Sequence, residues 1–338
     1  MKVDGKICVL NAGGWGTALS VLLAGKGYEV RLWARRPELA RQISLTRENP
    51  DYLPGVTIPR NVLVSPSLDE AVVGSSVVVV ATIFQGLKEL APRLGAVLAP
   101  DQLVVSAAKG LDEESLRRGS ELLEAALPPV HHGRIAAISG PNHAEEVSRG
   151  IPTATVVACK DDAVALQIQS VLSAAAFRVY TNSDIVGVEL CGALKNVVAI
   201  AAGMSDGFGY GDNAKAALIT RSLAEIGRLV VVEGGQAYTV AGMAGIGDII
   251  ATCTSSHSRN RAAGEAIARG KSVEQVIASS PMVVEGIPAT RAVLKLARQR
   301  GVEMPITRQI HAVLFEGGSP QEVLAQLMTR ESTSEPWM

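Results

Sequence analysis

Short apolar runs alternate with stretches of helical periodicity through the first half of the chain. The runs are rich in Val, Ile and Leu, and they predict β-strands at residues 7–10, 30–33, 77–81, 103–106, 135–138, 155–158 and 178–180. Each run is short and is separated from the next by a turn-rich or helix-length segment, a pattern typical of parallel strands joined by crossover helices. The first half of the chain therefore predicts an α/β domain with a mostly parallel sheet.

The second half of the chain has helical periodicity without strand signals. From residue 184 onward, Ala, Leu, Glu, Arg and Ile recur at helical spacing, and glycines interrupt the pattern. The spacing predicts a long helix over 184–202 and late helices over 289–300, 306–316 and 320–328, the last with Ser319 as its N-cap. We therefore expect an α/β domain over residues 1–183 and an all-helical domain over residues 184–338.

The composition argues against binding to nucleic acid or membranes. Among 338 residues, 32 basic and 33 acidic side chains give a net charge of −1, so the chain has no general attraction for nucleic acid or anionic lipid. The longest uncharged stretch, residues 71–87, contains a β-branched run that suits a buried parallel strand better than a membrane span. The N-terminus shows no signal peptide. We expect a cytoplasmic protein that does not insert into membranes.

The four cysteines, Cys8, Cys159, Cys191 and Cys253, are scattered along the chain. Their spacing fits neither a disulfide framework nor a metal site, so we expect reduced thiols and no bound metal. An anionic ligand would then have to be held by a local arrangement of polar groups.

The first predicted strand runs directly into a glycine-rich turn, NAGGWG at residues 11–16, which opens a predicted helix at 17–25. In dinucleotide-binding folds such glycines permit a tight turn and bring the backbone close to the pyrophosphate, which the helix N-terminus then binds. We therefore predict a Rossmann-type domain that binds a dinucleotide at Gly13, Gly14 and Gly16. The alternative is an ordinary turn with several glycines, since Asn11 replaces the usual first glycine.

The end of the second predicted strand discriminates between cofactors. An acidic side chain there would accept hydrogen bonds from the adenosine ribose of NAD(H), but this chain has Arg35 and Arg36. A guanidinium can pair bidentately with a 2′-phosphate, which favours NADP(H). Tyr52 is a further candidate contact near the adenine. The alternative is that both arginines are solvated.

One face of the long helix at 184–202 combines small residues with a lysine and an asparagine. Projected at about 100° per residue, six residues fall within one third of the circumference: Glu189, Gly192, Lys195, Asn196, Ala199 and Gly203. A surface lysine that extends to solvent is the alternative interpretation. Because the helix is apolar all round, we expect Lys195 to be half buried and to serve in proton transfer.

Two further polar segments are candidates for chemistry. Asp248 follows Gly245 and Gly247 and precedes an apolar helix, and residues 256–261, SHSRNR, contain hydroxyl, amide and guanidinium groups at a helix start. Such a set can bind a phosphate or a sugar phosphate. A polar segment that only caps the helix is the alternative.

The motifs together resemble those of bacterial NAD(P)-dependent glycerol-3-phosphate dehydrogenase. The similarity lies in residues 9–19, 139–141, 192–196, 211–213, 247–248, 257–260, 284–286 and 304–307, in the family's order across nearly the whole chain. The resemblance implies that the chain interconverts dihydroxyacetone phosphate and sn-glycerol 3-phosphate by hydride transfer with NADP(H) or NAD(H). It also implies a homodimer that supplies glycerol phosphate for phospholipid synthesis.

The resemblance also assigns roles to individual residues. Lys195 matches the acid/base that acts on the substrate oxygen, and Asp248 matches an acid beside it. The matched substrate contacts are Lys109, Gly140, Ser258, Arg259 and Asn260. The matched cofactor contacts are Gly14, Trp15, Arg35, Ala144, Val283 and Glu285, with Lys109 and Arg259 also near the cofactor.

Two departures from the family pattern and two rival functions bear on these expectations. Asn11 replaces a glycine, and Asn142 stands where Ser or Thr is more common, although an amide can still donate a hydrogen bond to the substrate or accept one from it.

One rival function is that of a related dehydrogenase whose small hydroxy-acid substrate carries a carboxylate. The other is a non-catalytic NADP(H) sensor, which would not need Lys195, Asp248 and the Ser-Arg-Asn segment together.

Overall fold

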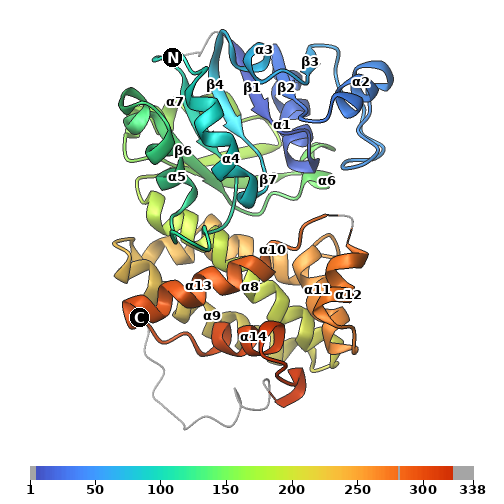
Figure 1. Cartoon of the computed structure of the whole chain (residues 1–338), viewed down its shortest axis with the longest axis vertical. Helices are drawn as coiled ribbons and strands as arrows, with labels where there is room; N and C mark the ends of the chain where they lie inside the picture. Colours follow the sequence, from blue (N-terminus) through green and yellow to red (C-terminus); the bar gives the residue numbers. More distant parts are fainter. Residues whose placement is uncertain (1–4, 281, 323–338) are drawn as a thin grey trace. The chain divides into compact units, whose positions relative to one another are not determined.

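The computed structural model describes residues 5–280 and 282–322, which form two compact units (Figure 1). The first unit contains the chain up to Lys109 together with Gly119–Ile185, and the second contains Gly110–Arg118 together with the chain from Val186 onward. The segment Gly110–Arg118 therefore belongs to the second unit, although the residues on either side of it belong to the first.

The first unit is built around an eight-stranded sheet with the order β3-β2-β1-β4-β5-β6-β7-β8. Strands β1 to β6 are parallel, β7 is antiparallel to β6, and β8 is parallel to β7. The predicted mostly parallel sheet is thus confirmed. The strands are β1 (Lys6–Leu10), β2 (Val30–Trp33), β3 (Val62–Ser65), β4 (Ser75–Val80), β5 (Leu103–Ser106), β6 (Ile135–Ser139), β7 (Thr153–Ala158) and β8 (Phe177–Asn182).

Strand β3 was not among the predicted strands. It is four residues long and forms one edge of the sheet, where Leu63 is 47% exposed. A short edge strand has no long apolar run, because one side of it makes no sheet contacts. Its pairing with β2 is a long-range property that the local pattern does not contain.

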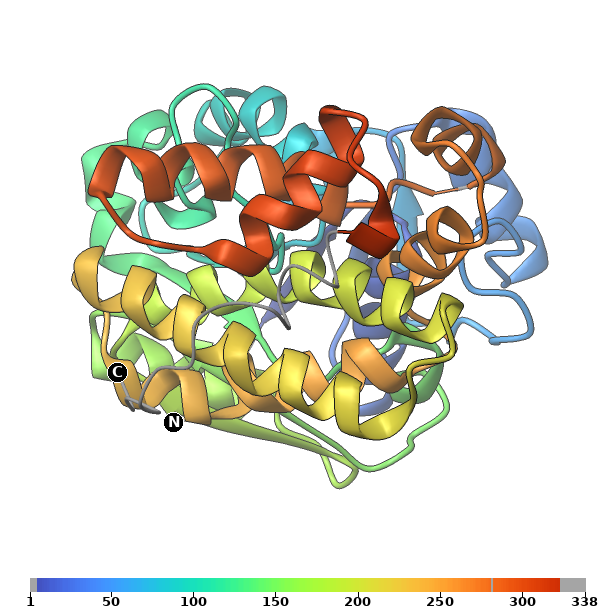
Figure 2. The same ribbon diagram turned by 90° about the horizontal axis from the view of Figure 1, so that it is seen from below.

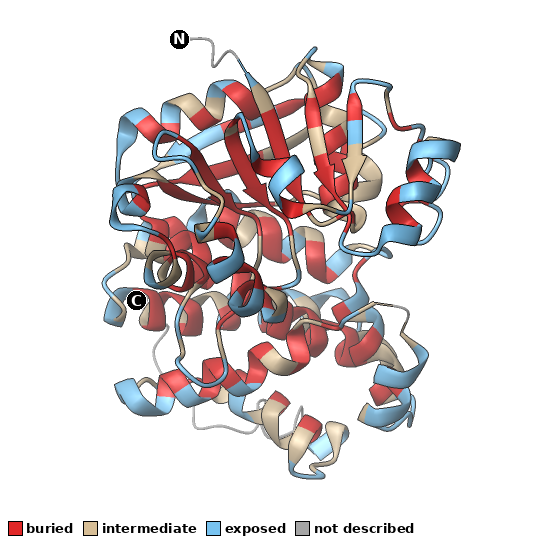
Figure 3. Cartoon of the chain, turned by 45° about the horizontal axis from the view of Figure 1, so that its top comes forward, coloured by how far each residue is buried: buried red, intermediate tan, exposed pale blue. Residues whose placement is uncertain are grey.

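Helices cover both faces of the sheet, so consecutive strand residues are buried on opposite sides. Ile7 and Val9 pack in the cluster that includes α1, α2 and α7, whereas Cys8 and Leu10 pack with α3, α4 and α5. The strands of the sheet are mostly buried (Figure 3). Burial on both faces explains the continuous apolar runs. The helices are α1 (Gly14–Gly25), α2 (Pro37–Thr46), α3 (Leu68–Val72), α4 (Phe84–Gly95), α5 (Gly119–Ala126), η1 (Pro129–Arg134), α6 (Ala144–Val147) and α7 (Asp162–Leu172).

The described residues of the second unit form helices and no strands, as predicted (Figure 2). The predicted helix at 184–202 continues to Gly207, and the late helices match α13 and α14. The elements are α8 (Ile185–Gly207), α9 (Gly211–Val232), η2 (Ala237–Ala241), η3 (Met243–Gly247), α10 (Asp248–Thr254), α11 (Arg259–Ala268), α12 (Val273–Ser279), α13 (Gly286–Arg300) and α14 (Pro305–Phe315).

The helix predicted at 320–328 is described only at its start. Residues 320–322 are helical, and the Ser319 hydroxyl accepts a hydrogen bond from the Glu322 backbone N–H at 3.5 Å, as expected for an N-cap. The remainder, from residue 323, lies outside the described residues.

Helix α8 is the core of the second unit. Among the described residues it alone is long and apolar enough to cross a membrane, but 94% of its apolar window is buried within the protein. It touches α11 through glycines: a Cβ at Gly203 would lie 1.9 Å from the Arg261 carbonyl oxygen, and one at Gly264 would lie 2.0 Å from that of Ile200. This backbone contact fixes the start of α11 beside α8.

A buried carboxylate joins α9 to α14. Glu225 accepts hydrogen bonds from the backbone N–H groups of Ile306 at 2.6 Å and Thr307 at 3.3 Å. The N-cap residue of α14, Met304, has no capping side chain, so Glu225 satisfies donors that would otherwise be buried without partners. Burial raises the pKa of Glu225 to about 7, while these hydrogen bonds act in the opposite direction.

Candidate functional site

The loops that follow four of the parallel strands carry most of the predicted residues of the first unit. The carboxyl ends of parallel strands meet at one edge of a sheet, and ligands of open α/β sheets bind there. Asn11–Gly16 follows β1, Arg35 and Arg36 follow β2, Lys109 lies just beyond β5, and Gly140 and Asn142 lie just beyond β6. The topology therefore brings these residues to the same edge.

The glycine-rich turn has the geometry of a phosphate cradle. Helix α1 begins at Gly14, three residues earlier than predicted, and no side chain caps its N-terminus. A Cβ at Gly16 would lie 2.0 Å from the Asn11 carbonyl oxygen, and one at Gly14 would lie 2.9 Å from that of Tyr52. A Cβ at Gly13 would meet only Asn11 Nδ2, at 3.3 Å. Gly14 and Gly16 thus permit close packing, whereas Gly13 borders open space beside free helix N–H groups, which fits a pyrophosphate.

Asn11 adopts a positive φ of 89°. Asparagine tolerates this region better than most residues other than glycine. Its Nδ2 also donates a hydrogen bond to the Ala81 carbonyl oxygen at 3.3 Å. The turn therefore keeps its shape without the usual first glycine.

Residues far along the chain support this turn. Asn49 is fully buried, and its Nδ2 donates to the Ala12 carbonyl oxygen at 2.9 Å and to Thr17 Oγ1 at 2.8 Å. Trp15 packs with its ring centroid 6.4 Å from that of Phe177. The Ala144 side chain lies 3.7 Å from where a Cβ of Gly14 would stand. The structure thus confirms that Trp15 and Ala144 lie at the turn, while Asn49 had no sequence signal.

Arg35 and Arg36 are both exposed, but they differ in their contacts. Arg36 Nη2 lies 2.7 Å from Asp51 Oδ2, and its guanidinium carbon lies 5.7 Å from the ring centroid of Tyr52. No ion pair of Arg35 is found in the described part of the chain. Arg36 and Tyr52 therefore belong to one cluster, to which Asp51 adds an acid that the sequence analysis did not consider.

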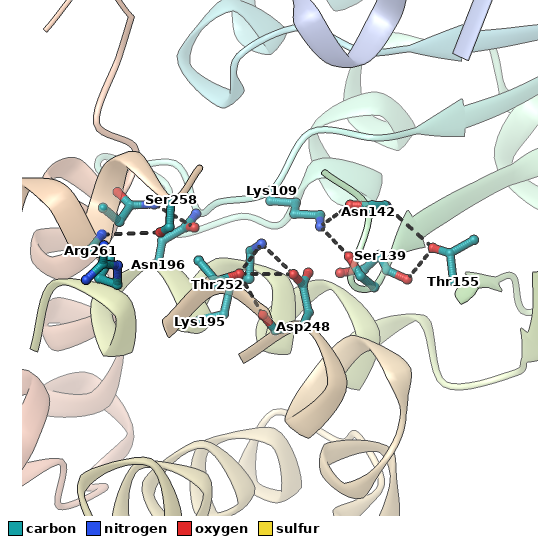
Figure 4. Close-up of polar contacts among 12 residues, drawn as sticks. Lys109, Ser139, Asn142, Thr155, Lys195, Asn196, Asp248, Thr252, Ser258 and Arg261 are labelled. Atoms are coloured by element: carbon teal, nitrogen blue, oxygen red, sulfur yellow. Dashed lines mark hydrogen bonds and ion pairs between the residues drawn. The ribbon is translucent and has the colours of Figure 1, made fainter. Parts of the chain in front are cut away.

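Lys109 forms a polar network with the loop after β6 (Figure 4). Its Nζ donates to the Gly140 carbonyl oxygen at 3.2 Å and to Asn142 Oδ1 at 3.1 Å. Asn142 Nδ2 in turn lies 3.5 Å from the Thr155 hydroxyl, which donates to the Ser139 carbonyl oxygen at 2.8 Å. The structure brings the three predicted substrate residues of the first unit together, supported by the buried Thr155.

Lys195 belongs to a second, buried cluster (Figure 4). It is only 9% exposed, and its Nζ donates to Asp248 Oδ1 at 2.6 Å and to the Thr252 hydroxyl at 2.9 Å. Thr252 also donates to the Asp248 carbonyl oxygen at 2.6 Å. Thr252 lies one turn after Asp248 on α10, so the two share a helix face. The predicted Lys195–Asp248 pair is confirmed, and that spacing was the signal for Thr252.

The glycine-containing turn before α10 places Asp248. A Cβ at Gly245 would lie 2.0 Å from the Val240 carbonyl oxygen, so no other residue fits there without rearrangement. Asp248 is the first residue of α10 and is 1% exposed. The Gly245-Ile246-Gly247 segment is thus needed for close backbone packing, which directs the acid toward Lys195.

Asn196 and Asn260 connect three helices next to this cluster. Asn260 Nδ2 donates to Asn196 Oδ1 at 2.9 Å, and Asn260 Oδ1 accepts from the Gly286 backbone N–H at 2.9 Å. A Cβ at Gly286 would lie 2.6 Å from the Asn196 carbonyl oxygen. Asn196 Nδ2 is buried and has no hydrogen-bond partner among the described residues. Burial of an unpaired donor is costly, which suggests a ligand contact that the sequence analysis left out.

The start of α11 is capped by Ser258, which is one of the two roles predicted for this segment. The Ser258 hydroxyl accepts a hydrogen bond from the Arg261 N–H at 3.2 Å and so caps the helix. Arg259 is exposed and donates to the Val283 carbonyl oxygen at 3.1 Å. The structure therefore brings Arg259 and Val283 together, and places Glu285 two residues further at the start of α13.

The described residues contain no group of three or more His, Cys, Asp or Glu side chains that could hold a metal ion. The four cysteines are buried and form no disulfide bond. Burial raises the pKa of the Cys253 thiol to about 12, although the Lys195 ammonium acts in the opposite direction. Cys253 is therefore a neutral thiol at neutral pH, and the polar chemistry of this unit rests on Lys195 and its partners.

Comparison with known proteins identifies the family. The model of the NAD-dependent glycerol-3-phosphate dehydrogenase N-terminus matches residues 6–165, and that of the C-terminus matches residues 184–325. The chain belongs to this family. A glycerol-3-phosphate dehydrogenase [NAD(P)+] of Chlorobium limicola is 50% identical over 329 residues, which cover 97% of this chain and 99% of that protein. The corresponding protein of Chlorobium phaeobacteroides is 48% identical over 330 residues, 98% of this chain and 99% of that protein.

A solved structure agrees with this assignment. The crystal structure of glycerol-3-phosphate dehydrogenase from Coxiella burnetii is 36% identical, covers 96% of this chain and 99% of its own, and gives a TM-score of 0.91. A Rossmann-type domain followed by a helical domain is thus the fold of this glycerol-3-phosphate dehydrogenase family member, as predicted. The chain is an NAD(P)-dependent oxidoreductase.

Proposed function

We propose that this chain reduces dihydroxyacetone phosphate to sn-glycerol 3-phosphate and that Lys195 is its general acid. The buried contact of Lys195 with Asp248 and Thr252 carries the proposal, because it presents one ammonium group held by two fixed acceptors. When bound, NAD(P)H supplies the hydride that adds to C2 of the ketone. Lys195 gives its proton to the C2 oxygen as negative charge develops there.

Asp248 and Thr252 orient the ammonium in this reaction. Two of its three N–H groups are used by these partners, so the third has a defined direction. The Asp248 carboxylate also places a negative charge 2.6 Å from the ammonium nitrogen. In the reverse direction the neutral amine accepts the proton of the C2 hydroxyl. Asn196 Nδ2, a buried donor, provides a further contact for a substrate oxygen.

Arg259 is the proposed phosphate ligand. Its exposed guanidinium stands at the first residue of α11, where backbone N–H groups also point outward. Ser258 accepts from Arg261 N–H, and its own O–H can donate to an anion. Asn260, Arg259 and Ser258 then bind the substrate, whose phosphate binding energy positions the ketone for attack. In this unit, Arg259, Val283 and Glu285 are also proposed to contact the cofactor.

The first unit is proposed to hold the dinucleotide. The open space beside Gly13 and the uncapped start of α1 suit the pyrophosphate, and Arg35 or Arg36 suits a 2′-phosphate. Further proposed cofactor contacts are Gly14, Trp15, Gly16, Tyr52, Lys109 and Ala144. Lys109, Gly140 and Asn142 are proposed substrate contacts.

Three broader expectations accompany this function. We propose the domain boundaries 1–183 and 184–338, a cytoplasmic location and a homodimer. Reduction of dihydroxyacetone phosphate would supply glycerol phosphate for phospholipid synthesis.

A turnover assay tests the function. Dihydroxyacetone phosphate is compared with a panel of 2-keto acids, each with NADPH and with NADH. We expect kcat/KM for the triose phosphate to exceed that for any keto acid, and NADPH to be used at least as well as NADH. Preference for a keto acid would favour the rival dehydrogenase, and binding of NADPH without turnover of any substrate would favour the sensor.

A further inference from the structure

An ion pair at the carboxyl end of β2 joins two loops of the first unit. Arg36 is the N-cap residue of α2, and its Nη2 lies 2.7 Å from Asp51 Oδ2. The guanidinium lies over the ring of Tyr52, the next residue after Asp51. The Tyr52 carbonyl oxygen would be 2.9 Å from a Cβ at Gly14, so this segment lies against the glycine-rich turn. Asp51 therefore stands beside the proposed dinucleotide site.

The position of this pair matches the part of a dinucleotide site that distinguishes the two cofactors. In Rossmann-type domains an acid near the end of the second strand binds the ribose 2′-hydroxyl of NAD(H), and an arginine there accommodates the 2′-phosphate of NADP(H). Here the arginine follows β2, whereas the acid comes from the loop between α2 and β3. Both kinds of side chain are present, and each is the other's partner.

We propose that Asp51 sets the cofactor selectivity of this enzyme. With NADH, its carboxylate accepts a hydrogen bond from the ribose 2′-hydroxyl. With NADPH, it competes with the 2′-phosphate for the Arg36 guanidinium and so limits the contribution of that arginine. The proposal rests on the dinucleotide site proposed above, and it accounts for one chain serving both cofactors.

The charges determine the expected direction. A phosphomonoester carries about −1.5 to −2 at pH 7, so Asp51 and the phosphate repel each other and share one cation. The Asp51 side chain is 46% exposed and that of Arg36 is 50% exposed, so water screens the interaction. We therefore expect a change of about threefold to tenfold for each cofactor, which corresponds to about 0.6–1.4 kcal/mol.

The test measures binding of NADPH and NADH by calorimetry without a triose substrate. The variants are Asp51→Asn, Arg36→Ala and the double variant, with Glu29→Gln as a matched control. Glu29 is also a half-exposed acid paired with an arginine, 3.1 Å from Arg31, but it precedes β2 and lies away from its carboxyl end. The control therefore removes the same charge from an ion pair at the other end of the strand.

Asp51→Asn should lower the dissociation constant of NADPH and raise that of NADH, by about threefold to tenfold each. In the Arg36→Ala background the gain for NADPH should shrink, because only the direct repulsion between Asp51 and the phosphate is then relieved and no guanidinium is freed, while the loss for NADH should remain. Glu29→Gln should leave the ratio of the two dissociation constants within about twofold.

Three results would overturn the proposal. These are equal changes for both cofactors in Asp51→Asn, a gain for NADPH that is undiminished in the Arg36→Ala background, and a shift of similar size in Glu29→Gln. A wild-type protein that binds neither cofactor would instead contradict the proposed dinucleotide site. Failure to turn over dihydroxyacetone phosphate, with selective cofactor binding intact, would contradict only the proposed reaction.

Discussion

Replacement of Lys195 by alanine tests the proposed chemistry at its centre. The change removes the ammonium that contacts Asp248 and Thr252, at 2.6 Å and 2.9 Å. Loss of a positioned general acid costs about 10²–10⁴ in rate, which corresponds to about 2.7–5.4 kcal/mol in the activation barrier. We expect kcat at saturating dihydroxyacetone phosphate and NADPH to fall by this factor, measured from the absorbance of the reduced nicotinamide.

The structure also predicts a cost in stability, which must be separated from the loss of catalysis. Asp248 is 1% exposed, and without Lys195 its charge would be buried without a cationic partner, at a cost of about 3–5 kcal/mol. Asp248→Asn in the same background removes that charge. The double variant should therefore regain thermal stability relative to Lys195→Ala, while its turnover stays low.

A neighbouring lysine provides the matched control. Lys215 on α9 is also paired with an aspartate, 2.6 Å from Asp206, and its side chain is 18% exposed. Lys215→Ala should keep kcat near the wild-type value. If Lys195→Ala retained more than about a tenth of wild-type kcat, or if Lys215→Ala lost as much, the assignment of the general acid would be wrong.

Three further predictions concern the cofactor turn, the phosphate site and stability. Gly13→Val should abolish NADPH binding, because a branched side chain would fill the open space beside α1. Asn11→Gly should change the cofactor KM by less than about tenfold. Titration of both variants with NADPH by protein fluorescence measures these effects, and a hundredfold gain in affinity for Asn11→Gly would show that the natural turn is damaged. Arg259→Ala should lower kcat/KM for dihydroxyacetone phosphate about tenfold more than kcat/KM for dihydroxyacetone, because only the former offers a phosphate to the guanidinium. Equal losses for the two substrates would refute this role of Arg259. Burial raises the pKa of Glu225 from 4.5 to about 7. Between pH 4.5 and pH 7 the folded protein therefore binds a proton that the unfolded chain does not, so the free energy of unfolding falls as the pH rises through this range. The total fall is about 3 kcal/mol. Denaturant unfolding at pH 5 and pH 8 should show a smaller fall in the free energy of unfolding for Glu225→Gln than for the wild type. An equal fall in both proteins would show that Glu225 is not the source of the pH dependence.

The sequence predicted those features whose signal is local. The apolar runs on both faces of the sheet and the one-turn spacing on α8 and α10 are properties of consecutive residues. Lys195 was predicted to be half buried because its helix is apolar all round, and at 9% exposed it is more deeply buried than predicted. The start of α11 could be identified because Ser258 is a typical N-cap residue.

The features that could not be predicted depend on contacts between distant segments. Gly110–Arg118 looks like part of the first unit in sequence, but Arg118 lies 2.8 Å from Glu189 and Lys295 Nζ donates to the Glu113 carbonyl oxygen at 3.1 Å. Each contact spans more than seventy residues and involves charged side chains that would suit a solvated loop equally well. No periodicity in either partner indicates the other.

Single buried polar residues form the second class of features without a sequence signal. Asn49 and Thr155 are fully buried, and each supports a loop of the proposed site: Asn49 through Ala12 and Thr17, and Thr155 through Asn142. An isolated Asn or Thr has the same local sequence pattern whether it supports a loop or faces solvent. Their hydrogen bonds alone distinguish them.

Asn11 shows why a departure from a motif must be judged by what each position requires. The first position of the turn requires a particular φ, which asparagine can adopt at a cost of about 1 kcal/mol and which its bond to the Ala81 carbonyl oxygen partly offsets. The position of Gly16 requires the absence of a side chain, because a Cβ would lie 2.0 Å from the Asn11 carbonyl oxygen. The first requirement admits a substitute and the second does not. The sequence changes the motif only where the backbone tolerates the change, so the turn retains the shape that dinucleotide binding needs.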